Sequence, residues 1–470
     1  MNYFYFFFFL FLSIIILFKP FFRILSNWVI NSQQLTLTGV LVSLLGIFCI
    51  YIGINNPFWY ERVWMIVTLV LGVIFVTRGI FIIFFLDKIK QLMSSYMKHY
   101  YKFSIPISIA MAVIAFMVVS SDYIGPQKDI SSCESDIDIS VICGFNNPED
   151  IVITPDKEFL LMSEFGGITP YEEQKPGFFA LLELSSGKRI IPNISIENSS
   201  WGDPSCIRSD YEFGPHGIDL IERSDGKFQL GVVSHFPNET IEMFEIQKNK
   251  ESWDMIWRGC INVPYEYYFN DISLKKDGGF YATHMYRRDI TLNEWLLTSM
   301  LKSNSGYLIE WNDNKFVKIE GTEGSGPNGI ALDDDSNLIF INYNQGDLIT
   351  TFDLSSNKKI QSQFVQSPDN PYIDGNYLWV TSLDFQPNDF GECEFKKSCS
   401  LPFSIYKLDK HTLDVIDKYS FSKTVFGLPT VAVPVGDNLY MGSFHSDRLG
   451  YFKINSVSYT HLTLPTKRIV

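Results

Sequence analysis

The sequence lacks the short motifs that mark many catalytic folds. It contains no phosphate-binding Gly-rich loop, no Gly-x-Ser-x-Gly elbow, no His-Glu-x-x-His motif and no Cys-x-x-Cys pair. Histidine is scarce, with 7 residues in 470, and Lys plus Arg (38) fall short of Asp plus Glu (52). Nucleophilic serine chemistry therefore has no support, and the net charge of −14 argues against a nucleic-acid partner.

Residues 1–121 have few charges and hold four long apolar runs. These runs are Tyr3–Phe22, Leu35–Ile54, Val63–Leu86 and Phe103–Ser120. Each run is close to the ~20 residues that span a bilayer as a helix, so we predict a membrane region of about four transmembrane helices. The first run also fits a signal sequence. Met97–His99 with the run that follows fits a signal anchor, which would make residues 1–92 a separate membrane module.

The distribution of charge predicts the orientation of this region. Residues 1–121 hold eight Lys or Arg and two Asp or Glu, so the rest of the chain must carry −20 to give the total of −14. The loop between the third and fourth runs is rich in lysine, at Lys88, Lys90, Lys98 and Lys102. By the positive-inside rule this loop is cytoplasmic. The region after Ser121 is then expected outside the cell or in a secretory lumen, which in a bacterium is the periplasmic side.

Two further features fit an oxidising compartment for this region. Six of the seven cysteines follow residue 122, whereas Cys49 lies in an apolar run. Six cysteines allow 15 pairings, of which Cys393 with Cys399 is the favoured local pair, although some could remain buried thiols. Three N-glycosylation sequons also occur here, beginning at Asn193, Asn198 and Asn238.

Five short polar signatures, each followed by a β-prone segment, recur after residue 140. They are Pro148-Glu149-Asp150-Ile151, Pro215-His216-Gly217-Ile218, Asn270-Asp271-Ile272, Pro327-Asn328-Gly329-Ile330 and Pro368-Asp369-Asn370. Their spacing of roughly 40 to 67 residues is the length of one four-stranded propeller blade. The innermost strands of a propeller begin around a shared channel, so these side chains should converge. Carboxylates, Asn amides and one His would then meet, a set of oxygen donors that suits calcium.

Strand–turn–strand units recur six times over about 310 residues, and no comparable helical periodicity appears outside the membrane region. The units are Ile151–Ser163, Ile218–Ser234, Ile272–His284, Gly329–Tyr343, Tyr372–Ser382 and Val431–Gly442. We therefore predict an all-β six-bladed β-propeller over residues 133–454. Residues 122–132 are expected to form a linker, and residues 455–470 an unstructured or non-native tail.

At these signatures the chain resembles the paraoxonase/arylesterase family of six-bladed, calcium-dependent lactonases and esterases, related to the SMP-30/gluconolactonase group. The resemblance covers roughly residues 133–454 and implies two calcium ions in the central tunnel, one catalytic and one structural. The implied ligands of the catalytic calcium are Glu149, Asn270, Asn328, Asp369 and Asn370. Those of the structural calcium are Asp150, Asp271 and the backbone carbonyl of Ile218.

The resemblance also assigns three of the seven histidines. His216 and His235 match the family's proposed histidine dyad, and His284 matches a further active-site histidine. Calcium can polarise a carbonyl, and a histidine with a near-neutral pKa can take a proton from the attacking water. For each histidine the alternative is a structural role, and for the Asn and Asp residues it is a turn at the strand entry.

The function that follows is a membrane-anchored, calcium-dependent hydrolase of lactones and/or aryl esters. Its expected partners are a small-molecule substrate and, through the N-terminal helices, the lipid bilayer, with no nucleic acid. The alternatives are a non-catalytic, calcium-stabilised propeller that binds a partner and a strictosidine-synthase-like propeller enzyme. Two features depart from the family: four apolar runs replace the usual one, and no cysteine follows Cys399 to tie the first strand to the last blade. Closure is therefore expected to rest on hydrogen bonds and packing.

Overall fold

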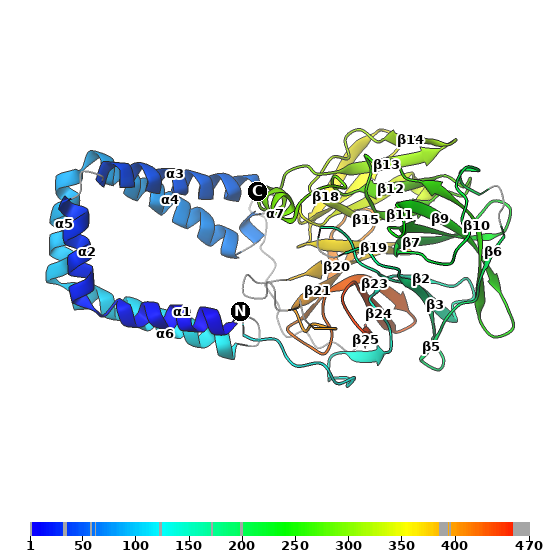
Figure 1. Cartoon of the computed structure of the whole chain (residues 1–470), viewed down its shortest axis with the longest axis horizontal. Helices are drawn as coiled ribbons and strands as arrows, with labels where there is room; N and C mark the ends of the chain where they lie inside the picture. Colours follow the sequence, from blue (N-terminus) through cyan, green and yellow to red (C-terminus); the bar gives the residue numbers. More distant parts are fainter. Residues whose placement is uncertain are drawn as a thin grey trace.

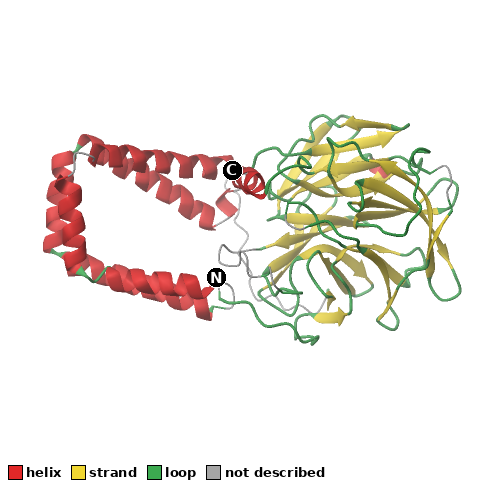
Figure 2. Cartoon of the chain, in the orientation of Figure 1, coloured by secondary structure: helices red, strands yellow, loops and turns green. Residues whose placement is uncertain are grey.

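An N-terminal helical region projects from one side of a β-propeller (Figures 1 and 2). The computed structural model describes residues 2–31, 35–56, 59–61, 63–121, 125–170, 173–197, 201–384, 393 and 396–454. The predicted tail 455–470 and the sequon at Asn198 lie outside the described residues.

The described part of the helical region contains six α-helices packed in pairs. They are α1 (Asn2–Ile15), α2 (Lys19–Asn31), α3 (Leu35–Asn55), α4 (Val63–Phe84), α5 (Leu86–Lys98) and α6 (Tyr100–Ser120), with the 3₁₀ turn η1 (Trp59–Glu61) before α4. Helix α1 packs on α6, α3 packs on α4, and α2 contacts α5. In Figure 1 the first two pairs run away from the propeller, and α2 and α5 lie at the far end.

Three of these helices are long and apolar enough to cross a membrane: α3, α6 and the stretch of α4 from Met65. The predicted first span, Tyr3–Phe22, is not a single helix, because α1 ends at Ile15 and the chain bends by 79° into α2. Pro20 fits the break: its ring clashes with the carbonyl four residues earlier in a continuous helix, at Ile16, and proline suits the first turn of a new helix. The region thus has three candidate spans, or up to four if the bent pair counts as one.

Glycines bring α3 and α4 into backbone contact. A Cβ added at Gly46 would lie 2.7 Å from the carbonyl oxygen of Gly72. One added at Gly79 would lie 2.6 Å from the carbonyl oxygen of Gly39. Small residues at such positions let helices approach closely in lipid, where burial of apolar side chains gives no advantage.

The propeller consists of six sheets, called blades 1 to 6 in chain order. Blade 1 contains β2 (Pro148–Ile153), β3 (Phe159–Glu164), β4 (Phe178–Glu183) and β5 (Lys188–Ile190). Blade 2 contains β6 (Ile194–Ile196), β7 (Pro215–Glu222), β8 (Phe228–Ser234), β9 (Thr240–Lys248) and β10 (Trp253–Asn262). Blade 3 contains β11 (Phe269–Leu274), β12 (Phe280–His284), β13 (Tyr307–Asn312) and β14 (Lys315–Lys318), with α7 (Leu292–Leu301) between β12 and β13.

The second half of the propeller repeats the same order. Blade 4 contains β15 (Pro327–Asp333), β16 (Leu338–Tyr343), β17 (Leu348–Asp353) and β18 (Lys358–Phe364), with the 3₁₀ turn η2 (Asp334–Ser336) after β15. Blade 5 contains β19 (Pro368–Asp374), β20 (Tyr377–Leu383), β21 (Phe403–Asp409) and β22 (Val415–Phe421). Blade 6 contains β23 (Pro429–Val435), β24 (Asn438–Ser443), β25 (Arg448–Lys453) and β1 (Ser140–Cys143).

The propeller closes by pairing its first strand with its last. Ser140 of β1 pairs with Tyr451 of β25, and Cys143 pairs with Arg448. The innermost strands β2, β7, β11, β15, β19 and β23 contact one another in a closed ring. The predicted six-bladed propeller is confirmed, and hydrogen-bonded strands close it, as the lack of a cysteine after Cys399 indicates.

Three disulfides lie within the propeller region. They are Cys133–Cys143, Cys206–Cys260 and Cys393–Cys399. The predicted pairing of Cys393 with Cys399 is confirmed, and Cys49 in α3 is unpaired. Cys133 and Cys143 bond to each other across ten residues, so neither ties the N-terminal segment to a distant blade.

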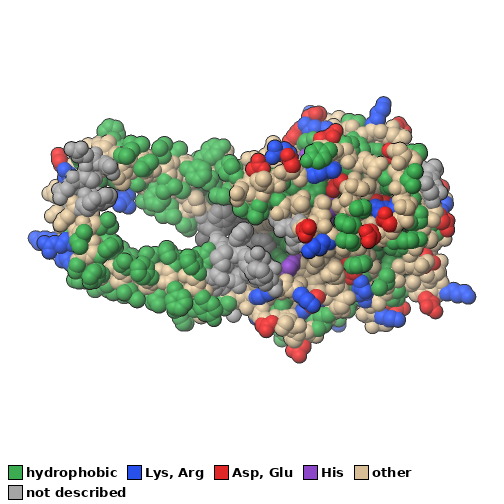
Figure 3. Space-filling model, in the orientation of Figure 1, with side chains coloured by type: hydrophobic (Ala, Val, Ile, Leu, Met, Phe, Trp, Pro, Cys, Tyr) green, Lys and Arg blue, Asp and Glu red, His purple; other side chains and the backbone are tan. Residues whose placement is uncertain are grey.

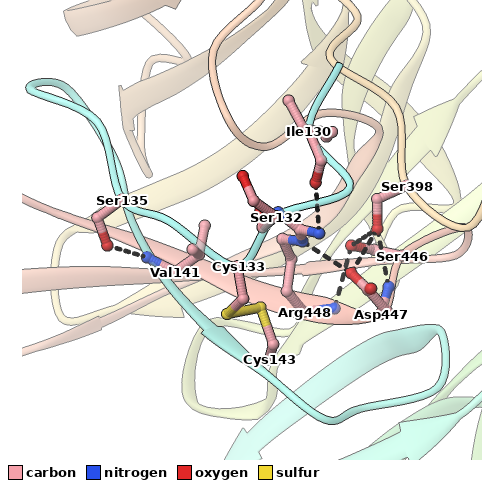
Figure 4. The surroundings of a disulfide bond; sticks show 10 residues. All are labelled: Ile130, Ser132, Cys133, Ser135, Val141, Cys143, Ser398, Ser446, Asp447 and Arg448. Atoms are coloured by element: carbon pink, nitrogen blue, oxygen red, sulfur yellow. Dashed lines mark hydrogen bonds and ion pairs between the residues drawn. A yellow bond between two sulfur atoms is a disulfide. The ribbon is translucent and has the colours of Figure 1, made fainter. Parts of the chain in front are cut away.

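The segment between the helical region and β1 lies against the propeller (Figure 4). Arg448 of β25, which is buried, donates from Nη2 to the carbonyl oxygen of Ile130 at 2.7 Å. The backbone N–H of Lys128 donates to Ser400 Oγ at 2.9 Å. Part of the stretch predicted as the linker 122–132 is therefore bound to blades 5 and 6.

Candidate functional site

The innermost strand of every blade begins with the same irregularity. After its first paired residue the register with the second strand shifts, between Pro148 and Asp150, Pro215 and Ile218, Phe269 and Ile272, Pro327 and Ile330, Pro368 and Pro371, and Pro429 and Ala432. Such β-bulges redirect side chains and often flank functional sites. Most of the predicted site residues lie at five of these six bulges, which explains why residues far apart in the sequence meet at the axis.

Glycines in two of the polar signatures hold neighbouring bulges close together. A Cβ added at Gly217 would lie 2.4 Å from Oδ1 of Asp271. One added at Gly329 would lie 2.4 Å from Cα of Asn370. A side chain at either position would push the adjacent innermost strand away, so glycine is required where two site residues approach.

Asp150 and Asp271, the predicted carboxylate ligands of the structural calcium, each join two innermost strands. Oδ2 of Asp150 accepts the backbone N–H of Ile218 at 2.8 Å, and Oδ2 of Asp271 accepts that of Ile330 at 2.8 Å. Burial raises the pKa of Asp150 to about 7. Burial and the charge of Asp150 raise the pKa of Asp271 well above its usual value. The predicted role of the Ile218 carbonyl stays a prediction.

The predicted ligands of the catalytic calcium include several oxygens without a hydrogen-bond donor. Glu149 Oε1 accepts from Asn370 Nδ2 at 3.2 Å, although the two residues are 221 positions apart. Glu149 Oε2, Asn328 Oδ1 and Asn370 Oδ1 are buried and have no partner among the described residues. Leaving a buried polar atom unsatisfied costs about 1–3 kcal/mol, so a ligand that accepts lone pairs would stabilise this arrangement.

The charge of the cluster favours a cation. Burial, followed by the charges of Asp150, Asp369 and Asp271, raises the pKa of Glu149 well above its usual value. Burial and Asp150 do the same for the pKa of Asp369. No Lys or Arg forms an ion pair with these four carboxylates within the described part of the chain.

The donor set therefore fits calcium, which prefers carboxylate, amide and carbonyl oxygens. The described residues contain no group of three or more His, Cys, Asp or Glu side chains arranged to hold a metal. The two predicted sets are consistent with this, because each has only two carboxylates and draws its other oxygens from amides or a backbone carbonyl.

His216, His235 and Glu239 form a hydrogen-bonded chain. His216 Nδ1 lies 2.9 Å from His235 Nε2, and His235 Nδ1 lies 2.9 Å from Glu239 Oε2. An ionised Glu239 can only accept, so Nδ1 of a neutral His235 carries the proton and its Nε2 accepts from His216. This leaves the lone pair of His216 at Nε2, which lies 3.7 Å from Glu149 Oε1.

The environment of His216 keeps its imidazole neutral. Burial, followed by the charge of His235, lowers the pKa of His216 well below its usual value. The ring also lies beside Phe165, with 4.6 Å between ring centroids. A neutral imidazole with its lone pair toward Glu149 is in the protonation state that a base requires.

Among the described residues, His284 is not hydrogen-bonded to His216, His235 or Glu239. Its Nδ1 accepts the backbone N–H of Tyr268 at 3.0 Å, and its ring lies 5.0 Å from that of Tyr307. Burial lowers the pKa of His284 to about 4. These contacts fix its tautomer, with the proton on Nε2, and its predicted part in the active site stays a prediction.

Two buried residues of the site were not predicted from the sequence. Glu239 follows β8 in the turn to β9, and Thr430 occupies the sixth bulge, where its Oγ1 donates to the carbonyl oxygen of Glu149. Thr381 Oγ1 in turn donates to the carbonyl oxygen of Thr430 at 2.9 Å. Proline begins β23 at Pro429, as it begins four other innermost strands. This proline is the feature of the sequence from which Thr430 could have been predicted.

An apolar wall lies beside the histidines and faces the helical region. Its members are Phe165, Ile168, Tyr268, Met285, Tyr286 and Ile290, with Trp295 and Phe444 packed against them. The ring of Tyr268 lies 5.1 Å from that of His235. Trp295 belongs to α7, which contacts α3 and lies between the propeller and that helix in Figure 1. An apolar substrate would find its hydrophobic surface on this side of the site.

A cavity of about 320 Å³ opens along the inner strands on the other side of the carboxylates. Asp150, Asp271 and Asn370 line it, together with aliphatic residues farther along these strands such as Val152 and Leu332. None of the three predicted histidines lines this cavity. It borders Asp150, Asp271 and Ile218 of the set predicted for the structural calcium, and Asn370 of the set predicted for the catalytic calcium.

A sequence model described as "Arylesterase" matches residues 137–446. The chain belongs to the arylesterase family. The match covers all six innermost strands and their bulges, and thus every predicted site residue. Membership of this family supports a hydrolase of esters or lactones in general, with small-molecule substrates.

Three solved structures to which this arylesterase-family chain is similar are remote in sequence. A luciferin-regenerating enzyme is 14% identical, covering 67% of this chain and 94% of that one, with a TM-score of 0.40. The periplasmic gluconolactonase PpgL of Pseudomonas aeruginosa is 12% identical, covering 65% and 81%, with a TM-score of 0.39. Regucalcin of Agrobacterium tumefaciens C58, a calcium-binding protein, is 10% identical, covering 66% and 90%, with a TM-score of 0.36. Similarity at this level carries no argument about ligand or substrate.

Proposed function

We propose that this arylesterase-family protein is a calcium-dependent hydrolase of lactones and/or aryl esters. One observation carries the proposal: the acceptor nitrogen of His216 lies 3.7 Å from Glu149, in a buried cluster where three oxygens have no hydrogen-bond donor among the described residues. A base and a set of oxygen ligands at one place are the parts that metal-assisted hydrolysis needs.

Two calcium ions are proposed, held by different residues of the bulges. The catalytic ion would be held by Glu149, Asn270, Asn328, Asp369 and Asn370. The structural ion would be held by Asp150, Asp271 and the carbonyl of Ile218. When bound, the catalytic ion would polarise the carbonyl of the ester or lactone and stabilise the negative charge that develops on its oxygen.

The protein's own residues supply the base. His216 Nε2 would take a proton from the attacking water, and the cation formed on its ring would be stabilised through its Nδ1–H bond to His235. Glu239 then acts as a positioning residue, because its bond to His235 Nδ1 fixes the tautomer of both rings. The wall that includes Phe165 and Tyr268 would hold the apolar part of the substrate and exclude water from the site.

We further propose that the helices anchor the protein in a membrane with the propeller on the side opposite the cytoplasm. Three apolar helices support membrane association, and three disulfides support an oxidising compartment for the propeller. The sequons at Asn193 and Asn238 have exposed asparagines, as glycosylation would require. Glycosidase-sensitive mobility in a eukaryotic host would support this orientation, whereas labelling of a cysteine introduced at Lys90 by an impermeant reagent on intact cells would contradict it.

The test of the activity is hydrolysis by the full-length protein in detergent. We expect turnover of a panel of γ- and δ-lactones and of phenyl acetate that is lost on chelation with EGTA and restored by calcium. Calcium binding is followed separately by the rise in the midpoint of thermal unfolding. Calcium that raises this midpoint without any hydrolysis would favour the non-catalytic propeller, and turnover that is indifferent to calcium would contradict the proposed mechanism.

A further inference from the structure

The basic residues of the helical region gather at its end away from the propeller. Six of the eight Lys and Arg of residues 1–121 lie there: Lys19 and Arg23 in α2, Lys88, Lys90 and Lys98 in α5, and Lys102 in the first turn of α6. Figure 3 shows blue side chains at this end of the molecule. Asp87 is the only acidic residue in the described part of these helices, and none of the six cations forms an ion pair with another described residue.

Helix α2 runs across the direction of the candidate spans. It is bent by 79° from α1, it contacts α5, and both helices have 13 residues. A helix of that length is about 20 Å long, too short to cross the ~30 Å hydrocarbon core. If α3, α4 and α6 cross the membrane, α2 and α5 therefore lie in its plane at the surface opposite the propeller (Figure 1).

Helix α5 has the two faces of a helix that lies at an interface. Its exposed residues include Lys88, Gln91, Ser95 and Lys98. Its half-buried residues include Leu86, Ile89, Met93, Tyr96 and Met97. Two residues depart from this division, since Lys90 is half-buried and Leu92 is 57% exposed. Basic side chains on one face and apolar ones on the other are typical of helices that bind anionic membranes through their charges.

Helix α2 adds apolar side chains that the described protein leaves uncovered. Phe21, Ile24 and Leu25 are exposed by 43%, 71% and 43%. Figure 3 shows an opening bounded by the two long helix pairs and the α2/α5 end, with predominantly apolar side chains around it. Acyl chains are the partner that fits this lining, and the surrounding head groups would then lie level with Arg23 and the lysines of α5.

We propose that α2 and α5 form a basic platform that binds the head groups of anionic phospholipids in the leaflet opposite the propeller. The platform comprises Lys19, Arg23, Lys88, Lys90, Lys98 and Lys102. Its cations gather at one end of the helical region, and no ion pair joins them to a carboxylate among the described residues. They lie at the ends of the candidate spans, which is the depth of the head groups. Phosphate and carboxylate groups of anionic lipids supply the missing negative charge.

The test measures lipid preference around the full-length protein. The protein is reconstituted in phosphatidylcholine nanodiscs with trace spin-labelled phosphatidylserine or phosphatidylcholine, and the motionally restricted fraction is measured by electron paramagnetic resonance. We expect a preference for phosphatidylserine of about threefold or more, since each basic residue near an anionic surface contributes a several-fold effect. The preference should fall toward onefold in the variant Arg23→Gln/Lys88→Gln/Lys98→Gln, whose three positions are exposed.

Two control variants separate charge from loss of fold. Lys188→Gln/Lys250→Gln/Lys358→Gln removes three exposed cations from the propeller and should leave the preference unchanged. Arg23→Lys/Lys88→Arg/Lys98→Arg keeps the charge on the platform and should retain the preference. Equal preference in the wild type and the platform Gln variant would overturn the proposal, as would loss of the preference in the charge-retaining variant.

A further arm distinguishes lipid from free phosphate as the ligand. Inorganic phosphate should reduce the phosphatidylserine preference no more than sodium chloride at the same ionic strength, because screening acts on both alike. Stronger competition by phosphate would show a site for the free ion and would contradict a lipid surface. The propeller is not required for this binding, so the result is independent of whether the protein hydrolyses lactones.

Discussion

The helical region and the propeller use the same apolar residues in opposite ways. Phe7, Phe11 and Phe116 on the helices are exposed by 60% or more, whereas Phe340 and Phe352 in the propeller are fully buried. Helices α3 and α4 associate through backbone contact at glycines, and the helices leave these apolar side chains exposed, as helices suited to a lipid environment do. The propeller instead packs its apolar side chains between sheets, as an all-β core does in water.

The two regions differ equally in how they treat charge. The helical region has most of its charged residues at one end, while the propeller buries four carboxylates together at its axis. Buried charge is costly unless it is paired, protonated or bound to a metal. The ring of six innermost strands can meet that cost by holding a cation, because it brings side chains from several blades to one axis. Changes at the axis should therefore affect chemistry, and changes in the helices should not.

Loss of a calcium ligand should have the largest effect. We expect Asp369→Ala and Asn270→Ala each to reduce hydrolysis to background and to lower the thermal midpoint of the propeller, because bound metal stabilises the fold. Asp374→Ala, on the exposed end of the same strand β19, is the matched control. It should change neither hydrolysis nor the thermal midpoint appreciably. Initial rates and calorimetry provide the measurement. Full activity of Asp369→Ala would remove this residue from the ligand set.

Replacement of the base should come next. His216→Gln should lower kcat by ~10²–10⁴-fold. Its calcium affinity, measured by titration calorimetry, should stay nearly unchanged, because imidazole is a poor ligand for this hard ion. Since burial and His235 lower the pKa of His216, the wild-type enzyme should keep a neutral base, and its activity, below pH 6.5. The acidic limb of its kcat profile should be absent from the variant. Unchanged kcat would leave calcium polarisation alone as the mechanism.

Loss of the positioning carboxylate should have a smaller effect. Glu239→Gln should lower kcat by about 10- to 100-fold, the range seen when a residue that orients a functional ligand is changed. The Gln amide can donate to His235 Nδ1 and so favour the wrong tautomer in both rings. The acidic limb should shift, a change that a purely structural role would not produce. Glu222→Gln at the exposed end of β7 is the control.

Calcium removal should also make the stability of the propeller depend on pH. Burial raises the pKa of Asp150 from 3.8 to about 7, so between these values the native state binds more protons than the unfolded state. Stability should therefore fall as pH rises from about 4 to about 7 in EGTA. Added calcium should abolish the decline, because the ion supplies the positive charge that the proton gave. Thermal midpoints at pH 5 and pH 8 test this, and a midpoint that rises with pH in EGTA would contradict it.

A change in the helical region should have the smallest effect on function. Gly79→Leu would force α3 and α4 apart, because even a Cβ at this position lies 2.6 Å from the Gly39 carbonyl oxygen. We expect a loss of about 1–3 kcal/mol in helix-pair stability, as for other overpacked contacts. Thermal loss of helical circular dichroism in detergent measures it. Lactone hydrolysis and the propeller midpoint should not change, and Val73→Leu on the exposed face of α4 is the control.

The sequence predicted the propeller and the convergence of the polar signatures at its axis, because the strand entries carry recognisable residues. Proline, asparagine and glycine stand at fixed offsets before apolar segments, so the bulges can be recognised without knowledge of the contacts between blades. Thr430 was not predicted, because a threonine in the sixth bulge looks like an ordinary strand residue in the sequence. Glu239 escaped for a different reason: it lies in a turn, and only the path of the β8–β9 connection directs its carboxylate to His235.

The helical region shows the limit of hydropathy as a guide. The prediction from apolar runs located α3, α4 and α6 but treated Tyr3–Phe22 as one span, because mean hydropathy does not register the backbone restriction at Pro20. The direction of α2, and with it the basic platform, follows from that restriction. Neither the length of the apolar run nor the number of lysines predicts the direction of α2.

The small Cys133–Cys143 loop has a mechanical consequence. A pull on the helical region would act first on the contacts of Lys128 and Ile130 with blades 5 and 6, and then on Cys133, before it reached β1. The disulfide transmits this force directly from Cys133 to Cys143. Residues Ser140 to Ile142 then carry no tension and stay paired with β25. Without this bond, the same pull would peel the outermost strand of blade 6 from its first residue onward. The disulfide thus keeps a pull on the N-terminal segment from opening the strand pair that closes the ring.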